Sequence, residues 1–207
     1  MGPRERRERE REEVRTRILD AARELFASEG VESVTMRRIA ERIEYSTTAI
    51  YFHFRDKEAL LAELCDCDFR AFAHGFTLIA QIQDPVERLV AAGRAYVEFG
   101  LNHPSHYRLM FMTPKTTEAS TIAKGNPEED AYAFLKSIVA ELMARGRFRA
   151  DLGNDADLVS QVIWAAMHGL VSLEIAKCKD EWVEWRPVEQ RAGIVVDMIL
   201  RGLLKGE

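Results

Sequence analysis

The chain has 207 residues, 47% of them hydrophobic, which is enough to bury a sizeable core in one medium or two small domains. Its formal net charge of -5 excludes a protein that coats nucleic acid with a basic surface all round, so any DNA binding has to use a restricted part of the surface. Residues 1–58 carry equal numbers of basic and acidic side chains, and the net negative charge therefore lies in residues 59–207.

The start of the chain is charged rather than apolar. Alternating Arg and Glu follow Pro3, without the apolar core of a signal peptide, and no window approaches the roughly 18 apolar residues of a membrane span. The 3 cysteines form no even disulfide framework and are expected to be buried or idle thiols in a reducing compartment. We therefore expect a cytoplasmic protein that is neither exported nor membrane-spanning.

Three short helical patterns open the chain. Apolar residues recur at intervals of three and four over residues 11–29, which predicts an amphipathic helix that Gly30 ends. Segments 35–43 and 46–54 each begin with a hydroxyl residue that can cap a short helix. Residues 1–10 are a charged extension that either frays or lengthens the first helix.

The rest of the chain also has helical periodicity and no strand alternation. A long helix is expected from Glu58 to near Asp84 and Pro85. Further segments are expected in this order: a helix over 85–102, an amphipathic piece over 107–111, a loop over 113–127, and helices over 128–145, 155–178 and 187–204. The fold class is therefore all-α, with a helix-turn-helix DNA-binding domain over 1–57 and a helical ligand-binding and dimerisation domain over 58–207.

The two short helices carry the residue types that a DNA-reading helix needs. Residues just after the cap of the second helix enter the major groove, where Thr47 and Thr48 can offer a hydroxyl and a methyl group to base edges. Phosphates need donors around this centre, and these are expected to be Thr35, Arg37, Ser46, Tyr51, His53 and Lys57.

Several of these side chains have alternative interpretations. Tyr51 and Phe52 are also compatible with a place in the core, and His53 with metal binding. Arg38 is compatible either with a phosphate contact or with a solvated helix face.

A run of interlocking motifs resembles the tetracycline-repressor (TetR) family of bacterial regulators. The matching stretches are residues 18–26, Gly30, residues 35–40, residues 46–54 and residues 57–61. Sequences of this kind usually carry Gly where Glu44 stands. Glutamate at this position affects the geometry of the turn and places an acidic side chain near the DNA. The resemblance implies a homodimer on a palindromic operator, whose two heads change spacing when a small molecule binds the C-terminal domain.

The last two predicted helices have broad apolar faces, which favours a four-helix dimer interface with a second chain; an intramolecular core is the alternative. The residues expected in this interface are Leu158, Val162, Ala166, Leu173, Val195, Met198 and Ile199.

The stretch Trp164 to Gly169 resembles the Trp-x-x-x-His-Gly signature of one branch of the family's C-terminal domains, and residues 96–111 look similar to the same branch. We expect an apolar effector pocket with a few polar groups, and plain core packing is the alternative for each aromatic residue. Its expected lining is Phe69, Phe72, Phe76, Tyr96, Phe99, Met110, Phe111, Trp164, Met167 and His168.

No motif in the sequence indicates catalysis, a cofactor or a metal site. A nucleophile elbow, a Gly-rich phosphate loop and an H-E-x-x-H helix are all missing from the sequence. The leading hypothesis is a repressor released from operator DNA by a small apolar or amphipathic ligand. The alternatives are a ligand-dependent activator, a helical ligand-binding protein without DNA binding, and a small helical enzyme.

Overall fold

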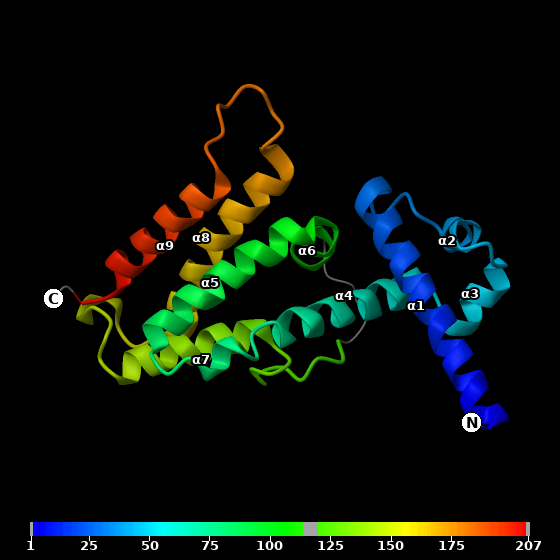
Figure 1. Cartoon of the computed structure of the whole chain (residues 1–207), viewed down its shortest axis with the longest axis horizontal. Helices are drawn as coiled ribbons and strands as arrows, with labels where there is room; N and C mark the ends of the chain where they lie inside the picture. Colours follow the sequence, from blue (N-terminus) through cyan, green and yellow to red (C-terminus); the bar gives the residue numbers. More distant parts are fainter. Residues whose placement is uncertain (1, 114–119, 206–207) are drawn as a thin grey trace. The chain divides into compact units, whose positions relative to one another are not determined.

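The computed structural model describes residues 2–113 and 120–205, and their regular structure is helical (Figure 1). A single isolated antiparallel bridge joins Phe148 to Leu204. The predicted all-α fold is confirmed for these residues. The chain forms two compact units, the first made of Met1–Asp68 with Ser105–Thr121 and the second of Phe69–Pro104 with Ile122–Glu207. The functional boundary predicted between residues 57 and 58 stays a prediction.

The first unit packs helices from two separate parts of the sequence around one apolar core. Its helices are α1 (Pro3–Glu29), α2 (Met36–Arg42), α3 (Thr47–His53), most of α4 (Lys57–His74), and α6 (Pro104–Phe111) except its first residue. The core contains Ile18, Leu25, Ile39, Ile50, Leu60, Leu64 and Leu109. Leu109 belongs to α6, so this helix contributes to the core beneath the N-terminal helices.

The charged N-terminal extension is helical from Pro3 onward. Proline suits the first turn because its missing N–H has no partner there. The backbone N–H of Gly2 donates to Glu5 at 2.9 Å, and ion pairs four residues apart follow along the helix. The extension therefore lengthens α1, one of the two outcomes that the sequence left open.

The helix predicted from Glu58 to near Pro85 ends earlier, at His74, so this expectation was wrong in extent. Gly75 follows, and its N–H bonds to the carbonyls of Ala71 and Phe72 as the chain turns. The centre of the Phe76 ring then lies 4.9 Å from that of Phe72, and this aromatic contact stabilises the turn. A short 3-10 turn, η1 (Ile79–Gln81), leads to the next helix.

In the described part of the second unit, a separate core is surrounded by the end of α4 and by α5 (Pro85–Asn102), α7 (Ala131–Ala144), α8 (Ala156–Lys177) and α9 (Val188–Leu203). Asp84, Asp130 and Asp155 cap α5, α7 and α8 by accepting backbone N–H groups. Helix α5 packs against α7, α8 and α9. The core contains Tyr96, Phe134, Ile138, Leu142, Ile163, Met167 and Val171.

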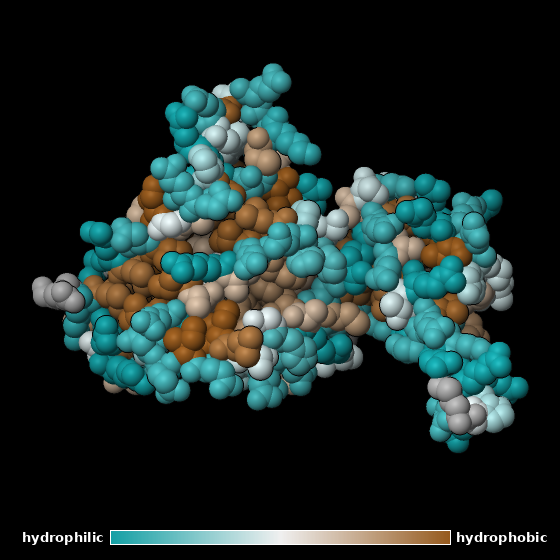
Figure 2. All heavy atoms as spheres, in the orientation of Figure 1, coloured by the Kyte–Doolittle hydropathy of each residue, from teal (hydrophilic) through white to brown (hydrophobic). Residues whose placement is uncertain are grey.

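Helix α8 is apolar on two faces. Val159, Ile163 and Met167 are buried inside the second unit, whereas Leu158 and Val162 are each more than half exposed. Hydrophobic side chains gather on the part of the surface formed by α8 and α9 (Figure 2). By length and composition α8 could cross a membrane, contrary to the sequence expectation, although core helices of soluble proteins pass the same test.

Candidate nucleic-acid interface

The capping residues of α2 and α3 place the polar side chains of both helices. The Thr35 hydroxyl oxygen accepts the N–H of Arg38 at 3.1 Å, and the Ser46 oxygen accepts the N–H of Ala49 at 3.2 Å. Both caps were predicted, and both are confirmed. Each hydroxyl keeps its own hydrogen as a donor. Since Ile39 and Ile50 are fully buried between the helices, the polar positions point outward.

The turn between α2 and α3 holds Glu44 in the left-handed region, at a φ of 61°. A non-glycine residue pays for this conformation because its Cβ crowds the following carbonyl. The next residue, Tyr45, donates its N–H to the Ala40 carbonyl at 3.0 Å and fixes the turn. The glycine that similar sequences carry here would relieve that crowding.

The start of α3 presents short side chains. Thr48 is exposed and Thr47 is half-buried, directly after the cap. One turn later Tyr51 is 52% exposed and Phe52 is 72% exposed. The core alternative for these two aromatic residues therefore does not fit their exposure, and the α3 surface combines hydroxyl groups with exposed rings.

His53 closes α3 beside two arginines. Burial lowers the pKa of its imidazole, and the positive charges of Arg11 and Arg15 lower it further. Its Nδ1 atom is buried without a hydrogen-bond partner in the described part of the chain. The neutral imidazole is thus favoured, and it can donate a hydrogen bond to a phosphate from only one ring nitrogen.

The predicted phosphate contacts differ in their freedom. The Arg37 side chain is 81% exposed and pairs with Glu41 at 2.9 Å. Lys57 is tied down, because its ammonium donates to the carbonyls of Val31 at 2.9 Å and Val34 at 3.1 Å. Lys57 therefore holds the loop before α2 onto the start of α4, a structural role that sequence reasoning missed.

Two buried carboxylates on α4 were not foreseen. Arg23 binds Asp68 through two nitrogens, at 2.8 and 3.3 Å, and His106 Nδ1 lies 3.1 Å from the same carboxylate. Asp66 accepts the Ser120 hydroxyl at 2.7 Å and the Thr121 N–H at 2.6 Å. These carboxylates join α1, α4, α6 and the 120–121 segment within the first unit.

The sequence held a signal for one of these carboxylates. Asp68 stands four residues after Leu64 and seven after Leu61, so it continues the buried face of α4. A carboxylate on a buried face requires a partner. The identity of that partner depends on long-range packing, which the sequence pattern does not specify.

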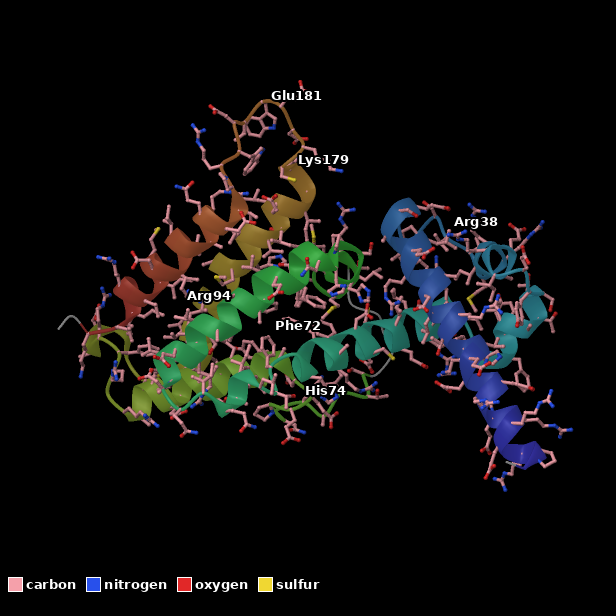
Figure 3. The ribbon with its side chains drawn as sticks, in the orientation of Figure 1. Arg38, Phe72, His74, Arg94, Lys179 and Glu181 are labelled. Atoms are coloured by element: carbon pink, nitrogen blue, oxygen red, sulfur yellow. The ribbon has the colours of Figure 1, made fainter. Side chains whose placement is uncertain are left out.

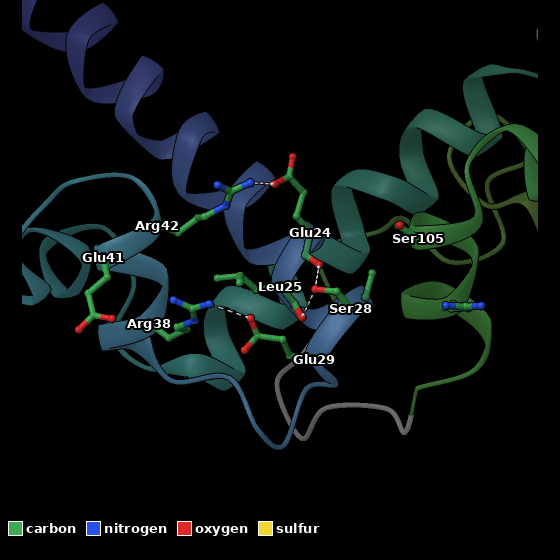
Figure 4. Close-up of a pocket in the computed structure, with 10 residues that line it drawn as sticks. Glu24, Leu25, Ser28, Glu29, Arg38, Glu41, Arg42 and Ser105 are labelled. Carbon is green, nitrogen blue, oxygen red and sulfur yellow. Dashed lines mark hydrogen bonds and ion pairs between the residues drawn. The ribbon is translucent and has the colours of Figure 1, made fainter.

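An open hollow of about 790 Å³ lies in the first unit along α1, α2 and α6 (Figure 4). Its lining is charged, but opposite charges face each other: Arg38 pairs with Glu29 at 3.1 Å and Arg42 with Glu24 at 2.9 Å. The Arg38 side chain is half exposed and its charge is paired with Glu29, and its two interpretations from sequence both stay predictions. None of the residues predicted to contact DNA or effector lines this hollow.

In the second unit, the predicted pocket residues come together only in part. Phe72 lies between α4 and α5 (Figure 3), with its ring 4.6 Å from Phe99 and 5.7 Å from Tyr96. The Tyr96 hydroxyl accepts the indole N–H of Trp164 at 3.1 Å and lies 3.3 Å from His168 Nδ1. Burial lowers the pKa of His168.

The remaining pocket residues are divided between the units. Phe69, Phe76 and Met167 belong to the second unit with the cluster around Tyr96. Met110 and Phe111 lie on α6 in the first unit, where the Phe111 ring packs 4.8 Å from Tyr107. The ten residues therefore do not form one cluster within a single unit.

Two family models match the chain in succession. Residues 18–64 match the bacterial regulatory proteins of the tetR family, and residues 89–182 match the tetracyclin repressor-like C-terminal domain. The chain belongs to the tetR family. The N-terminal match of this tetR-family protein spans α2, α3 and most of the first-unit core.

Individual relatives agree with this assignment. The chain is 44% identical over 59 residues to the HTH-type transcriptional repressor Rv1474c of Mycobacterium tuberculosis, a match that covers 28% of this chain and 32% of the relative. It is 35% identical over 78 residues to the HTH-type transcriptional regulator UidR of Escherichia coli K12, covering 38% and 37%. These matches span about a third of the length of the curated relatives.

A solved structure matches the fold of this tetR-family protein over nearly its full length. It is a protein of unknown function from Rhodococcus sp. RHA1, with a TM-score of 0.71 and 25% identity over 92% of this chain and 95% of the other.

Proposed function

We propose that this tetR-family protein is a cytoplasmic, homodimeric transcriptional repressor that binds a palindromic operator and releases it when a small apolar or amphipathic ligand binds the second unit. The observation that carries the proposal is the start of α3, where Thr47 and Thr48 follow the Ser46 cap on a matched helix-turn-helix segment. A threonine at this position offers a hydroxyl to base edges and a methyl to thymine.

The phosphate contacts follow from the surroundings of α3. Thr35 and Ser46 each accept a capping N–H and keep a hydroxyl hydrogen for a phosphate oxygen. Arg37 and Tyr51 are exposed and within the same two helices. His53 donates as a neutral imidazole, and the Lys57 ammonium contributes its charge while it holds the loop before α2.

The partner expected on the exposed apolar face of α8 and α9 is a second copy of the chain. Leu158, Val162 and Leu173 recur along one side of α8, and Met198 on α9 is 66% exposed. Ala166 lies on the same side of α8, and Val195 and Ile199 flank Met198. A four-helix interface removes these side chains from water and aligns two heads with major-groove faces about 34–36 Å apart.

The effector site is proposed around the aromatic cluster of the second unit. The Tyr96 hydroxyl and His168 are polar groups among Phe72, Phe76 and Phe99, which fits a mostly apolar ligand with one hydrogen-bonding group. The Trp-x-x-x-His-Gly stretch at residues 164–169 lies inside the C-terminal match, and its assignment to one branch of these C-terminal domains is part of the proposal.

Release of DNA requires the ligand to bind more tightly to a dimer whose two helix-turn-helix segments are at a distance that does not match successive major grooves. Helix α4 belongs to both units, since the boundary between them falls between Asp68 and Phe69. Its backbone therefore connects the residues proposed to bind the effector with those proposed to bind DNA. A coupling free energy of roughly 1–3 kcal/mol changes DNA affinity about 5- to 150-fold.

A second candidate is a ligand-binding protein of the same fold that binds no DNA. Glu44 favours it, because this carboxylate stands in the turn before α3, where it repels phosphates. A ligand-dependent activator is a third arrangement of the same parts.

Selection of genomic fragments by the purified protein at near-physiological salt tests the proposal. The wild type is expected to enrich a palindrome, and the double variant T47A/T48A to lose sequence preference while it retains salt-dependent binding. Thr16→Ala is the matched control, since Thr16 is an exposed threonine of α1 outside both reading helices. Equal enrichment by T47A/T48A and wild type refutes the assignment of α3, and no enrichment with or without ligand favours the second candidate.

A further inference from the structure

The outer part of α1 sorts its charges by side. Successive residues of a helix turn by about 100°, so residues three, four or seven apart share a side. One side continues the line of the buried Ile18 and holds three arginines: Arg4, Arg7 and Arg11. A neighbouring side holds three glutamates: Glu5, Glu8 and Glu12. Residues 3–13 of α1 hold five arginines and five glutamates, so this stretch is neutral in total but basic on the arginine side.

Arg7 and Arg11, the two inner arginines of this side, form no ion pair with a carboxylate in the part of the chain that the structure describes. Pairs four residues apart neutralise other cations of the extension, such as Arg6 with Glu10 at 2.8 Å. Within residues 2–113 and 120–205, no carboxylate pairs with Arg7 or Arg11. Arg15, the next arginine of the series, is compensated, because its guanidinium pairs with Glu63 of α4. Arg7 and Arg11 repel each other across one turn, and like charges four residues apart on a helix cost about 0.2–0.5 kcal/mol per pair. This arrangement fits an anion from outside the chain.

The arginine side borders the exposed face of α3. The Arg11 guanidinium lies 5.4 Å from the centre of the exposed Phe52 ring. One turn further, Arg15 donates to the His53 carbonyl at 3.2 Å and lies over the Phe54 ring. Within the first unit, the N-terminal turns of α1 extend past α3 (Figure 1). The arginine side is thus continuous with the surface proposed to meet DNA.

We infer that the arginine side of α1 is a second DNA contact, through which Arg7 and Arg11, assisted by Arg4, bind phosphates that flank the half-site read by α3. The inference rests on the proposed function and adds a contact to it. From Arg4 to Arg11 the helix rises about 10 Å, and duplex DNA carries one charge per roughly 1.7 Å of its axis. Several phosphates therefore lie within reach of this stripe.

The double variant R7Q/R11Q tests the contact, with R6Q/R9Q as the matched control from the other sides of the same helix. Glutamine has nearly the helix propensity of arginine, so α1 is expected to persist, which far-ultraviolet circular dichroism checks. The probes are the palindromic duplex enriched by the wild type, with long flanks, and the same duplex trimmed to the palindrome. Affinity is measured over a salt series for each protein and probe.

On the long duplex R7Q/R11Q is expected to lose affinity on the order of tenfold, and its salt slope to fall by about 3–4 per dimer, since each phosphate contact contributes about 0.9. R6Q/R9Q should bind as the wild type does, and all three proteins should bind the trimmed duplex equally. Equal losses in both variants, or a loss that persists on the trimmed duplex, overturn the inference. If the wild type enriches a palindrome and R7Q/R11Q binds the long duplex as tightly as the wild type, this inference alone is overturned. If the wild type binds no duplex, the proposed function is overturned as well.

Discussion

Replacement of Asp68 by Asn tests the buried charges that join the helices of the first unit. The Asp68 side chain is 3% exposed and accepts from Arg23 of α1 through both oxygens, while His106 of α6 lies 3.1 Å away. Burial opposes the charge of Arg23, but its hydrogen bond to Asp68 and the charges of Asp68 and Asp20 outweigh burial, so the pKa of Arg23 is raised. Asparagine preserves the size of the side chain and removes its charge.

The expected cost is about 3 kcal/mol of unfolding free energy. Removal of one partner of a buried ion pair costs about 3–5 kcal/mol, because the other charge stays buried without compensation. The low end applies here, since Asp20 remains 2.8 Å from Arg23. A domain is stable by only about 5–15 kcal/mol, so the loss is easily measured.

Denaturant unfolding followed by circular dichroism measures the change, with Asp20→Asn as the matched control. Asp20 is 61% exposed and its pair with the same arginine is worth about 0–1 kcal/mol. The double variant R23M/D68L replaces the pair with apolar groups and is expected to be more stable than D68N. If D68N and D20N unfold at the same denaturant concentration, the buried pair does not stabilise the unit as argued.

Three further changes test the turn, the head and the second unit. Glu44→Gly is expected to raise the unfolding free energy by about 1 kcal/mol, because glycine accepts the φ of 61° without crowding. Glu44→Gln in the same denaturation assay should give no gain in stability. Both variants should bind DNA more tightly, because both remove the carboxylate that repels phosphates. Lys57→Met should lower thermal stability by removing the donor to Val31 and Val34, whereas Arg37→Met should leave the melting temperature within about a degree, since its pair is exposed. Burial lowers the pKa of His168 below its ordinary 6.5, so the unfolded chain binds more protons below that pH and stability falls as pH falls; His168→Gln should flatten this pH dependence in denaturation midpoints, and an unchanged slope would contradict it.

Local signals account for the parts of the fold that the sequence predicted well. Thr35 and Ser46 cap α2 and α3 as expected, because a capping hydroxyl acts within three residues of its own position. Helix α5 runs from Pro85 to Asn102, the predicted range. Here Asp84 supplies the cap and Pro104 begins the next helix two residues after the end.

Long-range packing accounts for the parts that the sequence missed. Periodicity carried the α4 prediction through Gly75, because the apolar residues beyond it keep helical spacing; the helix ends there as Phe76 turns onto Phe72. The partners of Asp68 come from α1 and α6, 45 and 38 residues away in sequence. The sequence pattern says that such a carboxylate needs a partner and does not say which.

Residues 1–58 have no net charge, yet this is compatible with DNA binding when arginines that pair with a carboxylate are distinguished from those that do not. Arg23 is held by a buried carboxylate, and Arg38 and Arg42 face glutamates across the open hollow, so these charges are already compensated within the first unit. Arg7 and Arg11 stand on the side of α1 that borders α3, without a carboxylate partner in the described residues. A count of charges over the segment therefore underestimates the positive potential at α3. The salt dependence of DNA binding should depend on these two arginines far more than on the three compensated ones, which net charge alone would treat as equal.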